Sequence, residues 1–346
     1  MNNELRITTA NELPSGTYQR QSGEVEPPVF IEWKLNPVSK PEMNRMLLSL
    51  VLPMLGFVLV LATLPLLAEL LVLTTAALLP AATSRAQGTE AKSNSFQLTV
   101  LVPAHNEEAL IGRCVQSVLS SADANTELLV VAHNCTDATV AVAQAAGARV
   151  LLLNDPGQTG KGCALHSGFA CTLDGSAQAV LVIDADSVLD TRLIAEVRRR
   201  FLMGAQALQC RYEVNNSQAN RRTRLMALAL QAFNVVRPLG RERLGLSVGI
   251  FGNGFALRRE VLERIPYNAN SVVEDLEYHL TLLRAGIRVE FVNSATVRGE
   301  MPLSNQGART QRARWEGGRR RMIRRWVPTL MGDLFRGRVK ALEPLL

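Results

Sequence analysis

The sequence predicts an α/β domain, built on a doubly wound and mostly parallel sheet, behind an N-terminal transmembrane anchor. Two observations support this prediction. Residues 46–80 form a run of 35 residues with a single charge, Glu69, and from residue 96 onward short apolar runs alternate with longer segments of helical periodicity. Alternating strands and helices are typical of a parallel sheet covered by helices on both faces.

The composition excludes several classes of protein. A chain of 346 residues with 47% hydrophobic residues and a net charge of +7 is not disordered over most of its length, and it has room for one large domain or two modest ones. The five cysteines form no CxxC pair, and the four histidines do not have the spacing of a zinc-binding helix. We therefore expect no disulfide framework, no zinc site and a reduced, cytosolic compartment.

The first 95 residues are expected to form three segments. Residues 1–45 mix polar and charged types without a period, which predicts a flexible tail. Residues 46–80 exceed the roughly 20 apolar residues that cross a bilayer and begin too late for a secretory signal peptide, so they predict a retained anchor. Pro65 and Glu69 leave open whether the anchor makes one pass or two. Residues 81–95 are rich in Ala, Ser, Thr and Gly and predict a linker.

Strands and helices are expected to alternate through the next part of the chain. Buried strands are predicted at 98–102, 127–131, 149–153 and 179–183, where short apolar runs occur. The segments between them predict helices at 107–121, 136–146 and 161–173. A further helix is expected from about 271 to 283, with Gly286 beyond its end.

Polar side chains follow three of these strands. Glu107 comes after the first strand, His133 and Asn134 after the second, and Asp184 and Asp186 after the fourth. Because ligands bind beyond the carboxyl ends of parallel strands, these side chains are expected to share one site. Two carboxylates at this spacing can share a divalent cation, and the cation can hold a diphosphate. The alternative is a solvated turn or a cap of the helix near Asp190.

Two glycine-rich segments do not match nucleotide-binding motifs. In the first segment, residues 157–162, the residue after Lys161 is glycine, where a P-loop needs Ser or Thr. Residues 249–254 precede a strand-like run and not a helix, so they favour a close approach of the backbone to a ligand. Downstream, Glu274 and Asp275 begin a helix, where acids either stabilise the helix dipole or act as a general base.

Six motifs in one order carry a family resemblance. They are PAHNEE, GKGCAL, DAD, GNGFALRR, VEDLEYHLTLLRAG and QRARW. The series resembles the membrane-bound inverting family 2 glycosyltransferases, which include cellulose, chitin and hyaluronan synthases and ceramide glucosyltransferase. It covers about residues 96–330. The resemblance implies a GT-A fold, hexosyl transfer from a nucleotide-diphosphate sugar that is usually UDP-linked, and a Mg²⁺ or Mn²⁺ ion.

On the donor side the resemblance implies roles for four residues. Glu107 would lie near the nucleoside and Lys161 beside the nucleotide or diphosphate. Asp184 and Asp186 would be the paired aspartates at the donor, with Asp186 nearest the metal.

On the catalytic and acceptor sides the resemblance implies roles for two further motifs. Asp275 would be the catalytic base, with Glu274 beside it in the same motif. Gln311, Arg314 and Trp315 match the QxxRW signature, in which Arg314 would steady the departing diphosphate and Gln311 and Trp315 would lie on the acceptor side.

The sequence departs from the family in two places. Many relatives carry an aspartate after the second strand, where this chain has Ala132, His133 and Asn134, so His133 or Asn134 would make that contact with the donor. Relatives also continue into further transmembrane helices after the QxxRW helix, and this sequence shows no second apolar span there. A translocation channel is therefore expected only if other membrane subunits supply it.

The C-terminal segment is strongly basic. Residues 298–346 contain 12 Lys/Arg and 4 acids, which leaves a charge of −1 on the rest of the chain. Arginines interleaved with apolar residues suit a helix on an anionic membrane surface, and no nucleic-acid motif accompanies them. We therefore divide the remaining chain into a glycosyltransferase domain at 96–306 and the QxxRW helix with a basic interfacial tail at 307–346.

The function predicted from the sequence is inverting glycosyl transfer at the cytosolic face of the cell inner membrane. The acceptor would be a polysaccharide or a lipid, and nucleic acid is not an expected partner. The alternative is a non-catalytic subunit of a membrane polysaccharide synthesis or export complex that binds a nucleotide sugar or acts as a scaffold.

Overall fold

The computed structural model describes residues 5–8, 30–33, 40–80, 95–269, 271–301, 305–337 and 343. The chain forms two compact units, Met1–Leu67 and Ala68–Leu346. The first contains an antiparallel pair of strands, β1 (Leu5–Thr8) and β2 (Phe30–Trp33), and most of helix α1 (Lys40–Ala77). Of the expected linker at 81–95, residues 81–94 lie outside the described residues.

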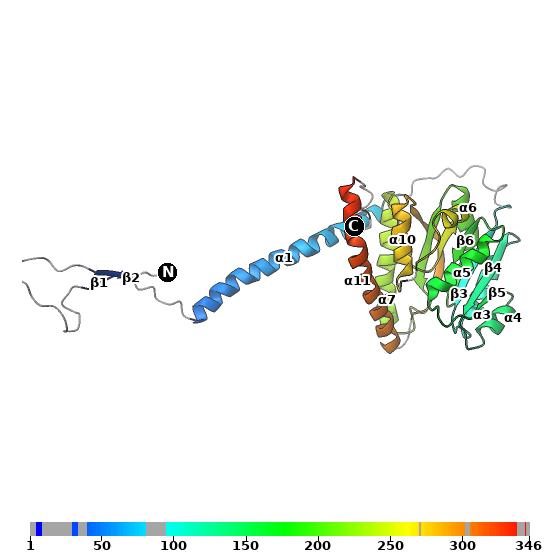
Figure 1. The fold of residues 1–346 in the computed structure, drawn as a ribbon, viewed down its shortest axis with the longest axis horizontal. Coiled ribbons are helices and arrows are strands. Elements are labelled where there is room, and N and C mark those ends of the chain that lie inside the picture. The colour runs from blue at the N-terminus through cyan, green and yellow to red at the C-terminus, as the bar shows by residue number, and fades with distance from the viewer. Residues whose placement is uncertain are drawn as a thin grey trace, which may run out of the picture. The chain divides into compact units, whose positions relative to one another are not determined.

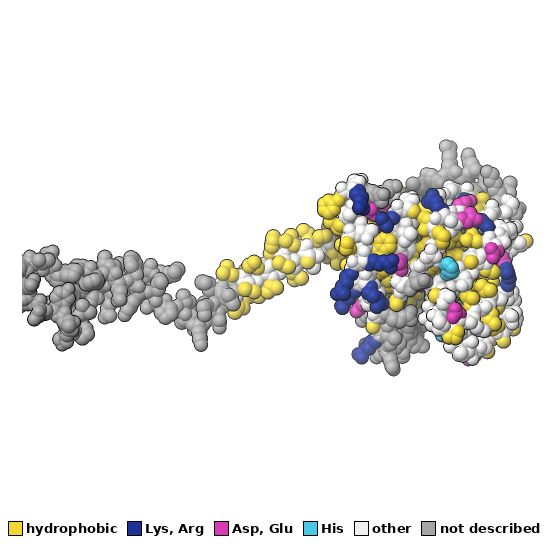
Figure 2. All heavy atoms as spheres, viewed as in Figure 1, with side chains coloured by type: hydrophobic (Ala, Val, Ile, Leu, Met, Phe, Trp, Pro, Cys, Tyr) yellow, Lys and Arg dark blue, Asp and Glu magenta, His cyan; other side chains and the backbone are white. Residues whose placement is uncertain are grey.

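Helix α1 has apolar side chains along its exposed surface (Figure 2). Its segment Leu48–Ala77 is long and apolar enough to cross a membrane, and no part of its most apolar stretch is buried. The helix is continuous through Pro53, Pro65 and Glu69. It is the single candidate span among the described residues.

The second unit contains an eight-stranded sheet in the order β5-β4-β3-β6-β9-β8-β10-β7. All neighbouring strands are parallel except that β9 runs against both of its neighbours and β7 runs against β10. The predicted doubly wound, mostly parallel sheet is therefore confirmed. The strands are β3 (Leu98–Ala104), β4 (Thr126–His133), β5 (Arg149–Leu153), β6 (Ala179–Val182), β7 (Val188–Leu189), β8 (Ala207–Val214), β9 (Phe255–Arg258) and β10 (Val289–Gly299).

Helices cover both faces of this sheet, as Figure 1 shows. Side chains alternate along β3, so Val100 and Val102 pack into the core on one face and Leu101 into the core on the other. Buried on both sides, the central strands need the continuous apolar runs that predicted them. The first face carries α3 (Ile111–Ser121), α4 (Thr139–Ala145) and α6 (Leu193–Leu202), and the second carries α5 (Lys161–Leu173), α9 (Arg259–Arg264) and α10 (Glu274–Arg284).

The helix expected from about residue 271 begins at Glu274. The two predicted helices that follow β3 and β4 also begin later than expected. Helix α3 begins at Ile111 and not at residue 107, because Asn106 has a φ of 54° and the Glu107 carbonyl accepts hydrogen bonds from the amides of Leu110 and Ile111 in a turn. Helix α4 begins at Thr139 and not at residue 136. Both differences lengthen the loops that follow β3 and β4, at the sheet edge where the predicted site lies.

The long C-terminal helix α11 (Asn305–Phe335) packs against α10 (Figure 1). Val273, Leu280, Met322 and Leu330 form the apolar contact between them. Gly318 is required for this approach, because a Cβ there would lie 2.7 Å from Cγ1 of Val273. The helix that carries QxxRW is thereby fixed beside the residues that precede Glu274.

Within the second unit, the end of α1 packs against α8 (Arg237–Arg243), which continues α7 (Arg221–Gln231) through a π-helical segment (Ala232–Val236). Arg237 forms an ion pair with Glu69 at 2.7 Å. Gly240 lies so close to α1 that a Cβ would be 2.1 Å from the carbonyl oxygen of Leu73. The one acid of the apolar segment therefore has an arginine partner, and a glycine permits the contact.

We expect Gly240→Ala to separate α1 from α8 and to lower stability by about 1–3 kcal/mol, because the added methyl group meets rigid backbone. Thermal unfolding of the full-length protein in detergent measures this. Gly332→Ala is the matched control, since the nearest described atom outside the backbone of its own helix is Nη1 of Arg336, 3.9 Å from the added Cβ. Equal unfolding temperatures for the two variants would contradict the close packing of α8 on α1.

Candidate active site

Lys161 is the centre of the candidate site. It is the first residue of α5, and its Nζ forms an ion pair with Oδ1 of Asp184 and donates a hydrogen bond to the carbonyl oxygen of Gly252. Burial opposes its charge, but the neighbouring carboxylates, Asp184 foremost, outweigh this and raise the pKa of Lys161. Lys161 therefore stays protonated and joins segments that lie 91 residues apart.

The glycine-rich segment 249–254 forms the loop that brings Asp275 to Lys161. Gly249, Gly252 and Gly254 have φ values of 101°, 78° and 71°, which L side chains rarely adopt. A Cβ on Gly252 would lie 3.2 Å from Oδ2 of Asp275, so the carboxylate rests directly on this loop. The close approach of this backbone to a ligand stays a prediction, and the side chain that the structure places against Gly252 is that of a predicted catalytic acid.

Glu274 and Asp275 form the first turn of α10. Oδ1 of Asp275 accepts a hydrogen bond from the amide of Leu276 at 2.8 Å, and burial raises the pKa of this carboxyl above its usual value. Burial raises the pKa of Glu274 to about 7, against the opposing charge of Lys161. Both acids hold protons more tightly than exposed carboxylates do, which suits groups that accept a proton.

Asp186 and Glu107 form the other side of the site. Burial, together with the charge of Asp184, raises the pKa of Asp186 to about 6. Burial and the charges of Asp186 and Asp184 raise the pKa of Glu107 to about 7. The carboxyl ends of β3 and β6 therefore bring three acids together, as the sheet topology predicted. Neither Asp184 nor Asp186 caps α6. The amide of Arg192, at the start of α6, donates its hydrogen bond to the carboxylate of Asp190.

A divalent cation fits this set of acids, although the described residues contain no group of three or more His, Cys, Asp or Glu around one position. Asp184 is already paired with Lys161, which leaves Asp186 and Glu107 as oxygen donors. Mg²⁺ is commonly held by one or two carboxylates, with water and substrate phosphate completing its coordination. A cation here would also relieve the crowding of negative charge that raises the pKa values of these acids.

Two polar residues that the sequence did not point out hold the site together. The Oδ1 of Asn253 accepts a hydrogen bond from the amide of Asp184 at 3.1 Å, and its Nδ2 donates to Oγ of Ser187 at 2.8 Å. Gln209 on β8 donates to the carbonyl of Asn253 at 2.8 Å and accepts from the amide of Phe251 at 2.9 Å. Asn253 lies within the GNG motif, whereas nothing in the sequence distinguishes Gln209.

Asn134 holds the loop that precedes Lys161. It has a φ of 51°, and its Oδ1 accepts from the amide of Asp155 at 2.8 Å while its Nδ2 donates to the carbonyls of Asp155 and Gln158. His133, buried at the end of β4, has its Nε2 3.2 Å from Nδ2 of Asn134. The described partners of Asn134 belong to the chain itself, and the donor contact expected of His133 or Asn134 stays a prediction.

The QxxRW residues lie on α11, but the side chains of Gln311, Arg314 and Trp315 are outside the described residues. Their predicted roles therefore remain predictions. Among the residues whose side chains are described, four carboxylates interact with the charge of Lys161, namely those of Asp184, Asp186, Glu274 and Asp275. Glu107 in turn lies near Asp184 and Asp186.

Residues 96–318 match the family model described as "Glycosyltransferase like family 2". The chain belongs to glycosyltransferase family 2. Membership, together with the mostly parallel eight-stranded sheet, confirms the family and the GT-A-type fold expected from the resemblance.

Among relatives of this family 2 glycosyltransferase, the probable glycosyltransferase YdaM of Bacillus subtilis is 24% identical over 242 residues, with 67% of this chain and 57% of the relative covered. The beta-monoglucosyldiacylglycerol synthase of Synechocystis is 29% identical over 252 residues, with 66% of this chain and 49% of the relative covered. The chain thus spans about half the length of the curated relatives it matches.

Similar solved structures include glucosyl-3-phosphoglycerate synthase from Mycobacterium tuberculosis. Its complex with Mg²⁺ and uridine diphosphate has 29% sequence identity and a TM-score of 0.45, with 63% of this chain and 77% of that chain covered. Its complex with Mn²⁺, UDP-glucose and phosphoglyceric acid has 29% identity and a TM-score of 0.47, with 65% and 81% covered.

Proposed function

We propose that the protein is a membrane-anchored inverting glycosyltransferase that moves a sugar from a nucleotide-diphosphate donor, a UDP-sugar, to an acceptor at the cytosolic membrane face. One observation carries this proposal. Lys161 connects Asp184 to the loop that contacts Asp275, which supports a donor site at Asp184 beside a base at Asp275.

The donor's diphosphate would lie at Lys161, Asp184 and Asp186. Asp186 and Glu107 would hold Mg²⁺ or Mn²⁺, which when bound supplies positive charge to the leaving diphosphate. Lys161 adds a fixed charge on the same side, where negative charge develops as the bond from the anomeric carbon to the diphosphate breaks. Arg314 would contribute a second positive charge from α11.

Asp275 would act on the acceptor side. In a direct displacement the acceptor hydroxyl oxygen forms the new bond to the anomeric carbon, and its proton passes to the carboxylate of Asp275. The amide of Leu276 holds Oδ1, which leaves Oδ2 as the oxygen that faces the glycine loop. Glu274, with its raised pKa, is the neighbouring acid that the same motif provides.

Two surfaces support a location at the membrane. Helix α1 exposes apolar residues over the length of a membrane span. Helix α11 exposes Arg319, Arg320 and Arg324 next to Ile323, which has 60% of its surface exposed, and Figure 2 shows basic side chains gathered over this helix. A lipid acceptor suits both surfaces, and one relative is named for the synthesis of a glucosyl lipid.

We expect the detergent-purified protein with Mn²⁺ or Mg²⁺ to release nucleoside diphosphate from one member of a panel of nucleotide sugars when membrane lipid extract supplies the acceptor. Free nucleoside diphosphate is the measured product. Asp186→Ala should abolish the metal-dependent release, because it removes the carboxylate nearest the metal. Asp174→Ala is the matched control, since Asp174 lies beyond the other end of α5.

Donor binding without release from any donor, with the extract present, would contradict this proposal. Such a result would favour the non-catalytic nucleotide-sugar-binding subunit.

A further inference from the structure

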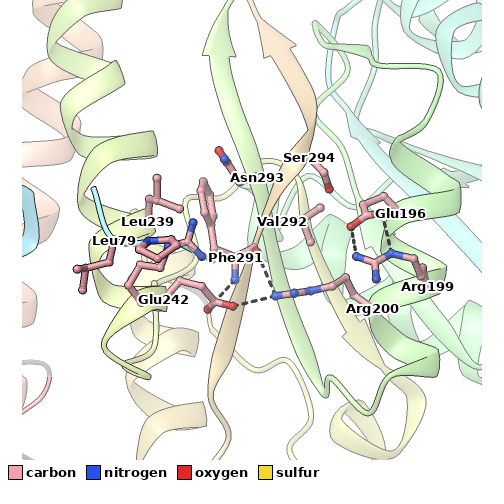
Figure 3. A pocket seen from close by; sticks show the side chains of 12 residues that line it. Leu79, Glu196, Arg199, Arg200, Leu239, Glu242, Phe291, Val292, Asn293 and Ser294 are labelled. Atoms are coloured by element: carbon pink, nitrogen blue, oxygen red, sulfur yellow. Dashed lines mark hydrogen bonds and ion pairs between the residues drawn. The ribbon is translucent and has the colours of Figure 1, made fainter. Parts of the chain in front are cut away.

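A pocket of about 750 Å³ lies at the end of α1 and shares no lining residue with the candidate active site (Figure 3). Its walls come from Leu79 and Pro80, two and three residues beyond the end of α1, and from α6, α8 and β10. Figure 3 shows Leu79 beside Leu239 on one side and the pair formed by Glu196 and Arg199 on the other. Nothing in the proposed transfer reaction uses this pocket.

The contact between α1 and α8 holds the end of α1 beside the pocket. The ion pair of Glu69 with Arg237 and the close approach at Gly240 fix the last turns of α1 to the helix that forms one pocket wall. Leu79 follows the apolar segment Leu48–Ala77 by two residues. If this segment crosses the bilayer, the pocket lies at the level of the lipid headgroups.

The charges in the pocket are not balanced. Three arginines and two glutamates line it. Arg199 is held by Glu196 at 2.6 Å, and Arg200 is held by Glu242 at 2.9 Å. Arg243 has no ion pair with any of the residues that the structure describes, and its Nε is buried without a hydrogen-bond partner. One guanidinium is therefore available for an anion that comes from outside the chain.

We propose that this pocket binds the phosphate of an anionic membrane lipid and that Arg243 contacts that phosphate. A guanidinium presents parallel donors that match phosphate oxygens. Leu79, Leu239 and Phe291 supply an apolar wall for the glycerol and the first acyl carbons. Anionic lipids are concentrated in the cytoplasmic leaflet, where the proposed orientation places the pocket. The inference rests on the membrane anchoring of the proposed function and does not depend on glycosyl transfer.

The test is direct binding to the full-length protein in a neutral detergent. Native mass spectrometry measures the affinity for dioctanoylphosphatidylglycerol, for dioctanoylphosphatidylcholine as the zwitterionic comparison, and for inorganic phosphate. We expect one tightly bound phosphatidylglycerol, which Arg243→Gln weakens about tenfold through the loss of charge-assisted hydrogen bonds, while Arg243→Lys weakens it less. Arg264→Gln is the matched control, because Arg264 is an exposed arginine in the last turn of α9.

A second variant keeps the test decisive if Arg243→Gln folds poorly. Ser294 is exposed at the pocket, so Ser294→Glu should fold and should repel the lipid phosphate. Equal affinity of all variants for phosphatidylglycerol, or equal affinity for both lipids, would overturn the proposal. Inorganic phosphate that binds as tightly as the lipid would also overturn it, by making free phosphate the ligand. Because this experiment measures lipid binding, a negative result would overturn the lipid site alone. The proposed glycosyl transfer is tested separately by the release of nucleoside diphosphate.

Discussion

Asp275→Asn is expected to lower kcat about 10³-fold and to leave donor affinity within about threefold of wild type, because it removes a proton acceptor and keeps the shape of the side chain. The amide oxygen can still accept the hydrogen bond from the amide of Leu276 that orients Oδ1. The residues proposed to hold the diphosphate, Lys161 and Asp184, are unchanged. Nucleoside diphosphate release gives kcat, and calorimetric titration with the donor gives the affinity.

Two isosteric variants on the same helix make this experiment specific. Glu277→Gln changes an acid of the first turn of α10 whose partner is Arg325, at 2.9 Å, and it should keep kcat within about twofold, since its described ion pair is with Arg325 and not with Lys161. Glu274→Gln tests the neighbouring acid. Loss of turnover in Glu274→Gln with full activity in Asp275→Asn would transfer the role of base to Glu274.

The sequence predicted the first half of the sheet better than the second. Strands β3, β4 and β6 are continuous apolar runs because they are buried on both faces. The edge strand β5 and helix α5 have the predicted ends, but β5 is only partly buried, contrary to the prediction of a buried strand there. Strand β8 contains Gln209, Arg211 and Glu213, so its pattern is mixed. Gln209 is fully buried because it bonds to the glycine loop. A polar residue that is buried for a single contact distant in the sequence interrupts the apolar pattern by which a buried strand is predicted.

For the site, the sequence predicted which residues come together but not what connects them. The acids after β3 and β6 converge because the carboxyl ends of parallel strands share an edge. The ion pair between Lys161 and Asp184 and the contact of Asp275 with Gly252 join segments separated by loops of irregular backbone. Such loops have no periodicity from which their path could be inferred. The role of Asn253 in positioning Asp184 therefore follows only from the structure.

Lys161→Met is expected to reduce kcat/KM about 10²–10³-fold, because the positive charge of Lys161 interacts with four carboxylates of the site. Without it, Asp184 loses its ion-pair partner and the negative potential at the site repels a nucleotide diphosphate. The loss should therefore appear in donor affinity as well as in turnover. Asp275→Asn, by contrast, affects turnover alone, so calorimetric titration with the donor separates the two roles.

Arg149→Met is the matched control for this substitution. It also breaks an ion pair, with Glu127 at 2.5 Å, but both side chains are about half exposed and the described partners of Arg149 are Glu127 and Cys171, neither of which is a site residue, so kcat/KM should not change. Excess Mg²⁺ should restore part of the donor affinity of Lys161→Met, because a cation at Asp186 acts on the same negative charge. If donor affinity were unchanged in Lys161→Met, Lys161 would be a structural link between α5 and the glycine loop, and the diphosphate would have to bind elsewhere along the edge formed by β3 and β6.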